Sequence, residues 1–260
     1  MKIKKPCLIP SAGLLFIMLC TTLWVTPRGF SYPVTLTDSR SKNITIDEKP
    51  ERIVSLVPSI TEIIFKIGAG DAVKAVTYHD SYPGEPGSKK IIGGFFSPSI
   101  SVIEAVQPGI IFISRLHKKV MKKFGHGKCK LINLETDSIS DSYKNITLLG
   151  SIFNKEKQAA RLIDEIKIQL RIISEKVDRI PDSKRKRVLR LMGRDPVMTP
   201  GDDSFQNEMI RAAGGIPPVL GKKGHIVVMT KEEWVRFNPQ VISPFKVVLL
   251  AILQKCYNNV

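Results

Sequence analysis

The sequence predicts an α/β fold of two lobes, each with a mostly parallel sheet, joined by one long helix. Between residues 52 and 134, short apolar runs alternate with helical segments, which is the pattern of βα units in a parallel sheet. Residues 154–177 carry apolar side chains at steps of three and four, as in one amphipathic helix. Strand-like and helical segments alternate again after residue 187, so a second α/β unit is expected there.

The first predicted lobe covers residues 51–150. Strands are expected at residues 53–56, 73–77, 110–113 and 130–134, and helices at residues 60–67, 100–106 and 117–124. Ser59 and Glu62 have the spacing of a capping box, which predicts that the first helix begins there. Gly68 or Gly70 is expected to end this helix, because glycine accepts the left-handed backbone of a helix C-terminus.

The predicted interlobe helix lies within residues 151–180. Its amphipathic stretch would be roughly 36 Å long at 1.5 Å per residue. We interpret this helix as a rigid strut between the lobes, and a packed helix or a coiled-coil partner is the alternative. A rigid connection predicts limited closure on a ligand.

The second predicted lobe covers residues 185–260. Strands are expected at residues 188–192, 197–199, 226–228 and 241–242. One helix is expected to open at Asp203-Ser204 and to end at Gly214-Gly215, and another is expected at residues 231–236.

The N-terminus has the features of a secretory signal. Lysines precede an apolar run from Leu14 to Val25, and about a dozen residues is too short to span a bilayer comfortably. We interpret residues 1–31 as a signal peptide that is cleaved after Ser31, which predicts an exported protein. A lipid anchor on Cys20 is an alternative, although the bulky Leu19 argues against it, and an uncleaved anchor is another.

Composition argues against several classes of protein. The chain has 260 residues, of which 43% are hydrophobic, so it can bury a core. Only Cys129 and Cys256 follow the signal, so neither a disulfide framework nor a cysteine-based metal site is expected. The net charge of +16 raises the question of nucleic acid, but no DNA-binding motif accompanies the basic clusters at residues 118–123 and 184–187. We therefore expect a solvated basic face and no nucleic-acid partner. If this face has a function, we expect it to attract an anionic membrane or ligand.

Polar and aromatic residues gather in the loops that follow the predicted strands. Ligands of open α/β sheets bind outside these strand ends, and a large planar ligand needs aromatic faces with a few polar groups. The expected ligand-binding residues are Tyr78, His79, Asp80, Tyr82, Phe95, Phe96, Ser97 and Arg115 in the first lobe, and Arg194, Thr199, Asp202 and Asp203 in the second. For Phe95 and Phe96, ordinary core packing is the alternative.

Neither catalysis nor a dedicated metal site is expected. His79 and Asp80 are adjacent, but no nucleophile elbow, P-loop, HExxH or GxGxxG motif accompanies them. The chain has four histidines, which form no evident cluster, so binding of a free ion such as zinc or manganese is the weaker alternative.

Three segments resemble, in the same order, the substrate-binding proteins of ABC importers for vitamin B12, ferric siderophores and haem. They are RIVSLVPSITEIIFKIGAGDAVKAVT followed by YHDSYP, IGGFFSPSISVIEAVQPGIIFIS, and TPGDDSFQNEMIRAAGG. The resemblance, which runs from about Glu51 to Ile242, implies a fold like that of class III periplasmic binding proteins. It also implies a periplasmic monomer without an intrinsic cofactor that captures a corrinoid or an iron chelate and delivers it to an ABC permease. His79 could then ligate cobalt or haem iron, and a loop histidine bonded to protein or solvent is the alternative.

The sequence departs from this family in two places. The family docks on its permease through a carboxylate on each lobe, but here the first-lobe position falls near Lys118 or Lys119 and the second falls near Arg211. Glu208 is therefore the expected docking residue. The segment after residue 243 does not resemble the family, so we expect a truncated, divergent second lobe with an exposed edge and an uncovered apolar face. A secreted enzyme of unknown reaction and a nonfunctional truncated paralogue are the alternative functions.

Overall fold

The computed structural model describes residues 32–80, 84 and 88–243 of the chain. The predicted signal peptide with Cys20, the expected ligand-binding residue Tyr82 and the divergent segment after Ser243 lie outside the described residues. Within the described part, no helix combines the length and the apolar character needed to cross a membrane.

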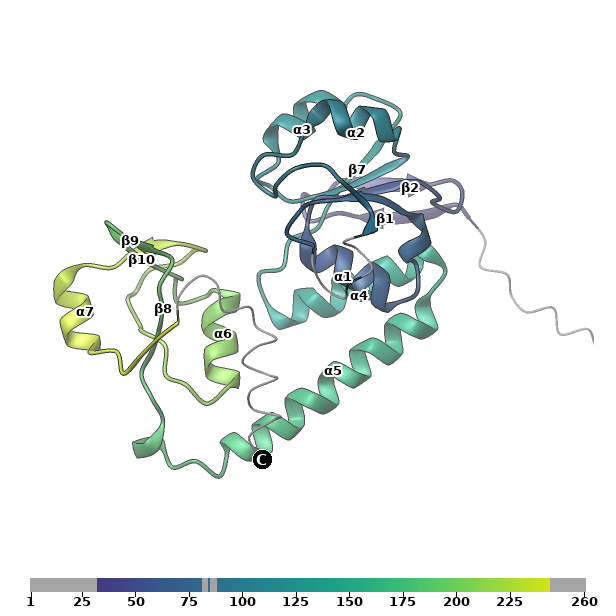
Figure 1. Cartoon of the computed structure of the whole chain (residues 1–260). Coiled ribbons are helices and arrows are strands. Elements are labelled where there is room, and N and C mark those ends of the chain that lie inside the picture. Colours follow the sequence, from purple (N-terminus) through teal and green to yellow (C-terminus); the bar gives the residue numbers. More distant parts are fainter. Residues whose placement is uncertain (1–31, 81–83, 85–87, 244–260) are drawn as a thin grey trace, which may run out of the picture. The chain divides into compact units, whose positions relative to one another are not determined.

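A five-stranded parallel sheet forms the centre of the first lobe (Figure 1). In spatial order its strands are β5 (Lys90–Ile91), β4 (Val73–Val76), β3 (Ile53–Ser55), β6 (Ile110–Ile113) and β7 (Lys130–Asn133). The four longer strands confirm the strands predicted for this lobe. The chain adds β4 and β5 on one side of β3 and then returns to place β6 on the other side. The topological switch point therefore lies between β3 and β6, where open α/β sheets bind ligands.

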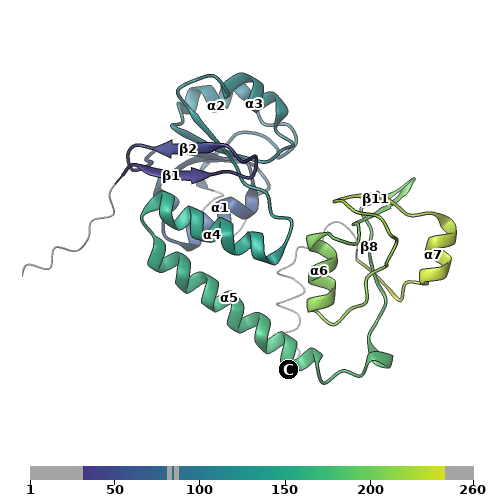
Figure 2. The same cartoon turned by 180° about the vertical axis from the view of Figure 1, so that it is seen from behind.

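Helices cover both faces of this sheet. They are α1 (Pro58–Lys66), α2 (Ile100–Val106), α3 (Lys118–Phe124) and α4 (Ile139–Phe153). Figures 1 and 2 show α2 and α3 on one side and α1 and α4 on the other. Ile53 packs into the apolar layer of α1 and α4, whereas the next residue, Val54, packs into that of α2 and α3. Burial on both faces explains why the strand sequences are continuously apolar rather than alternating.

Helix α1 begins earlier than predicted and has no side-chain cap. It starts at Pro58, with Val57 at the N-cap position, so the predicted capping box of Ser59 and Glu62 is wrong. Proline suits the first helical position because its fixed φ is already helical and the missing N–H has no partner within the helix there. The end of the helix is as predicted, since Gly68 follows with a φ of 76°.

The sequence patterns did not predict the hairpin of β1 (Val34–Thr37) and β2 (Asn43–Ile46), nor helix α4. The two strands are antiparallel and bury Leu36 against the layer of α1 and α4. The hairpin turn holds Asp38, whose buried carboxylate accepts hydrogen bonds from the backbone N–H groups of Arg40, Lys42 and Asn133. Because Asn133 belongs to β7, Asp38 ties the hairpin to the main sheet.

The predicted long helix is present as α5 (Glu156–Val177). Its first half packs on the first-lobe core through the buried Ala159 and the partly buried Leu162 and Ile166. Its last residue, Val177, lies against Gly214, where a β-carbon would be 3.1 Å from the valine side chain. The helix therefore contacts both parts of the chain, and its role as a rigid strut stays a prediction.

The described part of the second lobe, up to Ser243, contains two small sheets and two helices. Strands β8 (Val188–Arg190) and β12 (Val241–Ser243) pair in parallel, and β9 (Gly193–Arg194), β10 (Val197–Thr199) and β11 (Val227–Val228) form an antiparallel sheet. The helices are α6 (Phe205–Ala212) and α7 (Lys231–Phe237). A short 3₁₀ turn at Asp182–Lys184 precedes this lobe, and another at Gly70–Ala72 lies in the first lobe. Apart from β9, which the sequence did not predict, the strands and helices of the second lobe lie where the sequence places them. The short β9–β10 turn makes this sheet antiparallel, because a parallel pair needs a crossover.

Few apolar side chains are buried in the second lobe. Among its described residues, 182–243, the buried hydrophobic side chains other than proline are those of Leu189 and Met229. Val219 is 80% exposed and Val235 is 66% exposed. The apolar core thus lies mainly in the first lobe.

Candidate ligand-binding site

Five ring side chains cluster beyond the carboxyl ends of β4, β5 and β6. They are Tyr78, His79, Phe95, Phe96 and His117, and we call them the aromatic cluster. The rings of Tyr78 and His79 lie 4.3 Å apart, and Phe95 meets both Phe96 and His117 edge to face at 4.9 Å. Tyr78 is 62% exposed and Phe96 is 75% exposed. The cluster thus offers two open aromatic surfaces on an ordered base.

The backbone of residues 93–97 is fixed to the neighbouring loops at several points. The N–H of Tyr78 donates to the carbonyl of Gly93 at 3.0 Å. The N–H of Phe95 donates to Nδ1 of His79 at 3.3 Å, and the carbonyl of Phe95 lies 2.8 Å from Nε2 of His117. Phe95 is therefore held through both of its backbone polar groups by two imidazoles. Ser97, the other predicted residue of this loop, is exposed.

His117 is the anchor of this loop, and the sequence did not predict it as a site residue. It is only 3% exposed, and its Nδ1 accepts the N–H of Ser114 at 2.9 Å, so Nε2 carries the proton that is donated to Phe95. Burial lowers the pKa of His117 and outweighs the hydrogen bonds with Phe95 and Ser114 and the charge of Glu135, which raise it. A histidine just past a buried strand is the one sequence signal that could have identified it.

His79 lies in the cluster as a hydrogen-bonded loop histidine. Its Nδ1 accepts from the Phe95 N–H, so in the neutral ring the proton is on Nε2. A metal ligand needs a free lone pair, and here the free nitrogen of the neutral ring carries a hydrogen. This geometry favours the second of the two roles considered for His79. Within the described residues, no three His, Cys, Asp or Glu side chains are grouped so as to hold a metal ion.

Asp80 is buried below the cluster rather than open to it. It is 4% exposed, and its carboxylate accepts from the backbone N–H of Thr77 at 2.8 Å and from the Thr77 hydroxyl at 2.5 Å. Burial raises the pKa of Asp80 more than the Thr77 hydrogen bonds lower it. The carboxylate therefore shapes the loop after β4, and its contact with a ligand stays a prediction.

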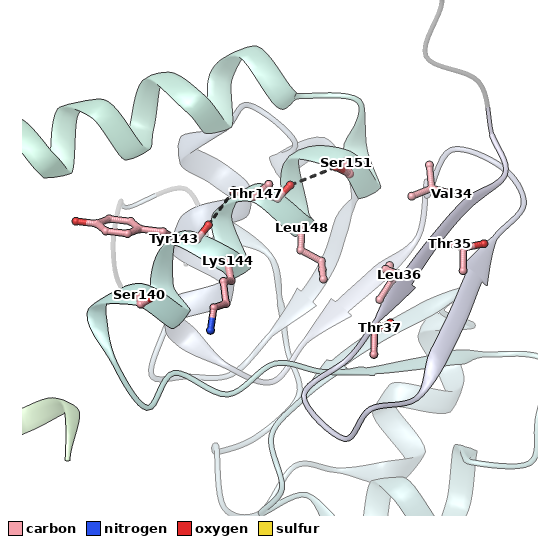
Figure 3. A pocket seen from close by; sticks show the side chains of 10 residues that line it. All are labelled: Val34, Thr35, Leu36, Thr37, Ser140, Tyr143, Lys144, Thr147, Leu148 and Ser151. Atoms are coloured by element: carbon pink, nitrogen blue, oxygen red, sulfur yellow. Dashed lines mark hydrogen bonds between the residues drawn. The ribbon is translucent and has the colours of Figure 1, made fainter. Parts of the chain in front are cut away.

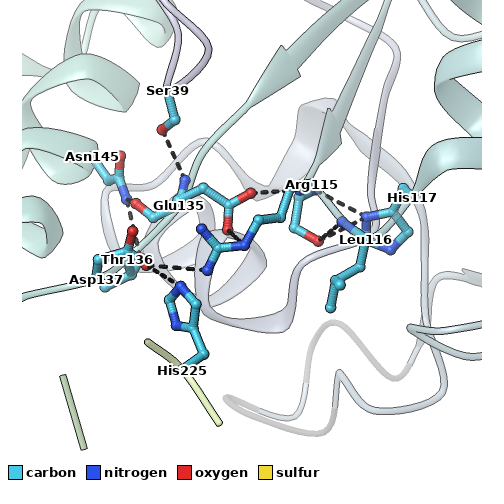
Figure 4. A network of polar contacts seen from close by, with 10 residues as sticks. Ser39, Arg115, Leu116, His117, Glu135, Thr136, Asp137, Asn145 and His225 are labelled. Atoms are coloured by element: carbon cyan, nitrogen blue, oxygen red, sulfur yellow. Dashed lines mark hydrogen bonds and ion pairs between the residues drawn. The ribbon is translucent and has the colours of Figure 1, made fainter. Parts of the chain in front are cut away.

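Arg115 stands at the edge of the site in a polar network (Figure 4). Its backbone N–H donates to the carboxylate of Glu135, and its guanidinium lies 3.5 Å from Oδ1 of Asp137. The same oxygen of Asp137 lies 3.3 Å from Nε2 of His225, a second-lobe residue. Arg115 is thus placed by two acidic side chains but stays partly exposed, with a free surface for an anionic group of a ligand.

The predicted second-lobe residues lie in a loop framework of their own. Asp202 accepts from the N–H groups of Leu220 at 2.9 Å and Gly221 at 2.7 Å, and Asp203 accepts from Gly224 at 2.8 Å. The Gly224 hydrogen bond is the main cause that lowers the pKa of Asp203, and the charge of His225 adds to it. Both carboxylates therefore hold residues 220–224 in place.

The other two second-lobe residues differ in exposure. Thr199 is fully buried at the end of β10, and among the described residues its hydroxyl has no hydrogen-bond partner. Arg194 is exposed on β9. Asp203 holds Gly224, and the next residue, His225, contacts Asp137 of the first-lobe network.

Glu208, the expected docking residue, is engaged within the molecule. Its Oε2 accepts the N–H of Ile139 at the start of α4, at 2.8 Å. Its role at a permease stays a prediction.

A separate groove lies between β1 and α4 (Figure 3). It has a volume of about 510 Å³ and is lined by Val34, Thr35, Leu36 and Thr37 from the strand and by Ser140, Tyr143, Lys144, Thr147, Leu148 and Ser151 from the helix. None of the predicted ligand-binding residues lines it.

The fold and the aromatic cluster at the sheet edge define a solute-binding protein of the two-lobed α/β class. The chain belongs to the periplasmic binding protein family, whose model matches residues 53–243.

Similar proteins are transport components. The uncharacterized ABC transporter substrate-binding lipoprotein YvrC of Bacillus subtilis is 31% identical over 217 residues, which cover 81% of this chain and 68% of YvrC. A cobalamin-binding protein of Halobacterium salinarum is 28% identical over 195 residues, or 72% of this chain. The match spans only about half, 51%, of that relative's length.

The fold agrees with solved structures. The crystal structure of a possible iron-binding (periplasmic solute-binding) protein from Staphylococcus epidermidis superposes with a TM-score of 0.66 and 25% identity, over 77% of this chain and 79% of that one.

Proposed function

We propose that this chain is the extracytoplasmic binding component of an ABC importer and that it captures a bulky metal chelate, either a corrinoid or an iron complex such as haem or a ferric siderophore. It holds and releases this ligand without chemical turnover. The N-terminal segment exports it and is cleaved after Ser31, and a lipid anchor on Cys20 is the alternative.

The exposure of Tyr78 and Phe96 carries this proposal. Aromatic side chains bury large apolar areas when they can, yet these two are mostly open although the loops beneath them are fixed by hydrogen bonds. A flat ligand that stacks on them would remove this surface from water. Family membership and the cobalamin-binding relative support the same class of ligand.

Polar groups around the aromatic cluster would orient the bound ligand. Arg115 offers a partly exposed guanidinium beside it, which suits a carboxylate or phosphate on the ligand. From the second lobe, Arg194, Thr199, Asp202 and Asp203 are the proposed contacts. Because Nδ1 of His79 accepts the Phe95 N–H, Nε2 of the neutral ring carries the hydrogen. We therefore propose that the ligand is held by aromatic faces and polar groups rather than by a bond from His79 to its metal.

A ligand screen with a matched variant tests this function. The purified chain is mixed with cyanocobalamin, haemin or ferrichrome, passed through a desalting column and examined for a chromophore that co-elutes with the protein in unchanged form. Tyr78→Ala should weaken binding of the retained compound by roughly tenfold or more, because it removes about 1.5–3 kcal/mol of apolar burial. Tyr143→Ala, in the separate groove, is the control and should bind as the unaltered chain does.

Two results would count against the proposal. One is that the unaltered chain retains none of the three compounds. The other is that Tyr78→Ala binds with unchanged affinity, which would place the ligand elsewhere. A chemically altered chromophore would instead favour the enzyme alternative.

A further inference from the structure

We propose that His117 is a positioning residue that fixes the Phe95–Phe96 edge of the aromatic cluster, and that its protonation at acidic pH loosens this edge and weakens ligand binding. The part that concerns ligand binding rests on the proposed function. The part that concerns the loop stands on the geometry alone.

The contacts of His117 leave no nitrogen unused. Nδ1 accepts the Ser114 N–H at 2.9 Å, and Nε2 donates to the Phe95 carbonyl at 2.8 Å. The imidazole ring also packs edge to face on the ring of Phe95, which in turn packs on Phe96. The side chain of His117 therefore joins the end of β6 to the loop after β5 through two hydrogen bonds and one ring contact.

Protonation would break this arrangement at Nδ1. Imidazolium carries a hydrogen on both nitrogens, so Nδ1–H would face the N–H of Ser114, and a buried backbone donor would lose its acceptor. The Ser114 hydroxyl already lies within hydrogen-bonding distance, 3.1 Å from Nδ1, and could accept from the new N–H. The backbone N–H of Ser114 would still face an N–H instead of an acceptor, and relieving this repulsion moves the ring away from Phe95.

The charged groups around His117 do not compensate for burial. Glu135 favours the protonated form, and Arg115 and Lys118 flank His117 in the chain. Burial is the larger effect and keeps the pKa of the imidazole below its usual 6.5. The ordered edge is therefore fully favoured above pH 6.5 and is progressively lost as the pH falls toward the lower pKa of the folded state, because the loosened state binds the proton more readily.

His79 is the other histidine that contacts Phe95. It faces the same residue from the other side, and its Nδ1 also accepts a hydrogen bond, from the Phe95 N–H. A test of the proposal must therefore distinguish the two histidines.

Hydrogen exchange of residues 93–97 measures the loop without any ligand. Protection factors, normalised to intrinsic exchange rates, are measured on the full chain at about pH 7.5 and about pH 5, on either side of the usual histidine pKa. We expect the protection factors of the unaltered chain to fall roughly fivefold or more on acidification. This change corresponds to a loss of about 1 kcal/mol in the free energy of local opening. His117→Phe, which keeps an aromatic ring but no hydrogen bond, should be unprotected at both pH values. His126→Phe, at an exposed position outside the network, is the control.

His117→Gln separates positioning from titration. Its amide can donate to the Phe95 carbonyl and does not titrate, so protection should be partly restored and should no longer depend on pH. If the pH dependence persists in His117→Gln, it does not arise from His117 and the proposal is overturned. It is also overturned if His117→Phe keeps the protection of the unaltered chain. Should His117→Phe fail to fold, His117→Gln and the unaltered chain alone decide the outcome.

A second measurement links the loop to binding. The affinities of cyanocobalamin and haemin are determined at the same two pH values, and we expect affinity to fall with loop protection in the unaltered chain but not in His117→Gln. If the exchange results are as expected and neither compound binds, the proposed ligand class fails while the positioning role of His117 stands. If a compound binds and its affinity stays constant while loop protection changes, the link between His117 and binding is overturned.

Discussion

Glu208 of α6 accepts a hydrogen bond from the backbone N–H of Ile139, the first residue of α4, although the two residues are 69 positions apart. A helix begins with N–H groups that lack partners within the helix, and a carboxylate there also interacts favourably with the helix dipole. Glu208 thus has a structural role at the start of α4, whatever its role at a permease.

Replacing Glu208 should therefore reduce stability. Glu208→Ala is expected to lower the free energy of unfolding by about 1 kcal/mol, because the Ile139 N–H loses its acceptor. Glu208→Gln keeps an acceptor oxygen and should lose less. Urea denaturation of both variants checks this, with the exposed Glu48→Gln as control. Equal stability of Glu208→Ala and the unaltered chain would show that the contact contributes nothing.

Asp80 should behave as a structural group whose charged form is disfavoured by burial. Since burial raises the pKa of Asp80, its contribution to stability is greatest at acidic pH and falls as the pH rises through this raised value. Asp80→Asn, which keeps an acceptor for Thr77 without the charge, should unfold at neutral pH with an unchanged or higher free energy. Asp80→Ala leaves the buried Thr77 N–H unpaired and should cost about 1–3 kcal/mol. Chemical denaturation at neutral and acidic pH measures both, and a destabilised Asp80→Asn would contradict this prediction.

Asp38 should have the opposite dependence on pH. Burial alone would raise its pKa, but the Arg40 side chain and the N–H groups of Lys42, Arg40 and Asn133 outweigh burial and lower it. Its stabilisation is therefore complete above the usual aspartate pKa and is lost as the pH falls toward the lower value of the folded state. Asp38→Asn should cost about 1–3 kcal/mol at neutral pH and little at strongly acidic pH.

The exposed Asp71→Asn is the matched control for Asp38. If the two variants show the same change in unfolding free energy across the pH range, the tie between the hairpin and β7 is not a source of stability.

Gly94 should matter for binding more than for folding. A β-carbon at this position would lie 2.5 Å from the hydroxyl oxygen and 2.8 Å from Cζ of Tyr78. The tyrosine ring is exposed and can move aside, so Gly94→Ala should leave the unfolding free energy nearly unchanged. The displaced ring should weaken binding of the retained chelate about two- to tenfold, the size of one aromatic contact. Titration of the ligand alongside thermal unfolding checks this, and Gly127→Ala, in an open loop, is the control.

Hydrophobic patterning predicted most of the fold, because it reports burial directly. The runs at β3, β4, β6 and β7 are strands buried on both faces, and the steps of three and four in α5 match its packed side. Helix α4 has the same kind of face but carries Ser, Thr and Asn between its apolar residues, and the N-terminal hairpin precedes the first βα unit. Local patterns are weak in both segments, and contacts distant in the chain stabilise them.

The candidate site was predictable only as a set of loops. The residue types after β4 and β5 indicated aromatic surface, and the structure does bring Tyr78, His79, Phe95 and Phe96 together. The sequence does not show that Asp80 points into the protein or that His117 anchors Phe95. Both depend on the direction of a side chain at the end of a strand. Those directions follow from three-dimensional packing.

The uneven core has a further consequence for how a ligand would leave. Apart from prolines, Leu189 and Met229 provide the buried apolar side chains among residues 182–243, whereas two apolar layers enclose the sheet of the first lobe. Local opening requires least free energy where the fewest apolar groups are sequestered. We therefore expect the two lobes to differ in mobility. The lobe that carries Tyr78 should stay ordered, whereas local opening of the lobe that carries Asp203 should set the rate at which a bound ligand dissociates.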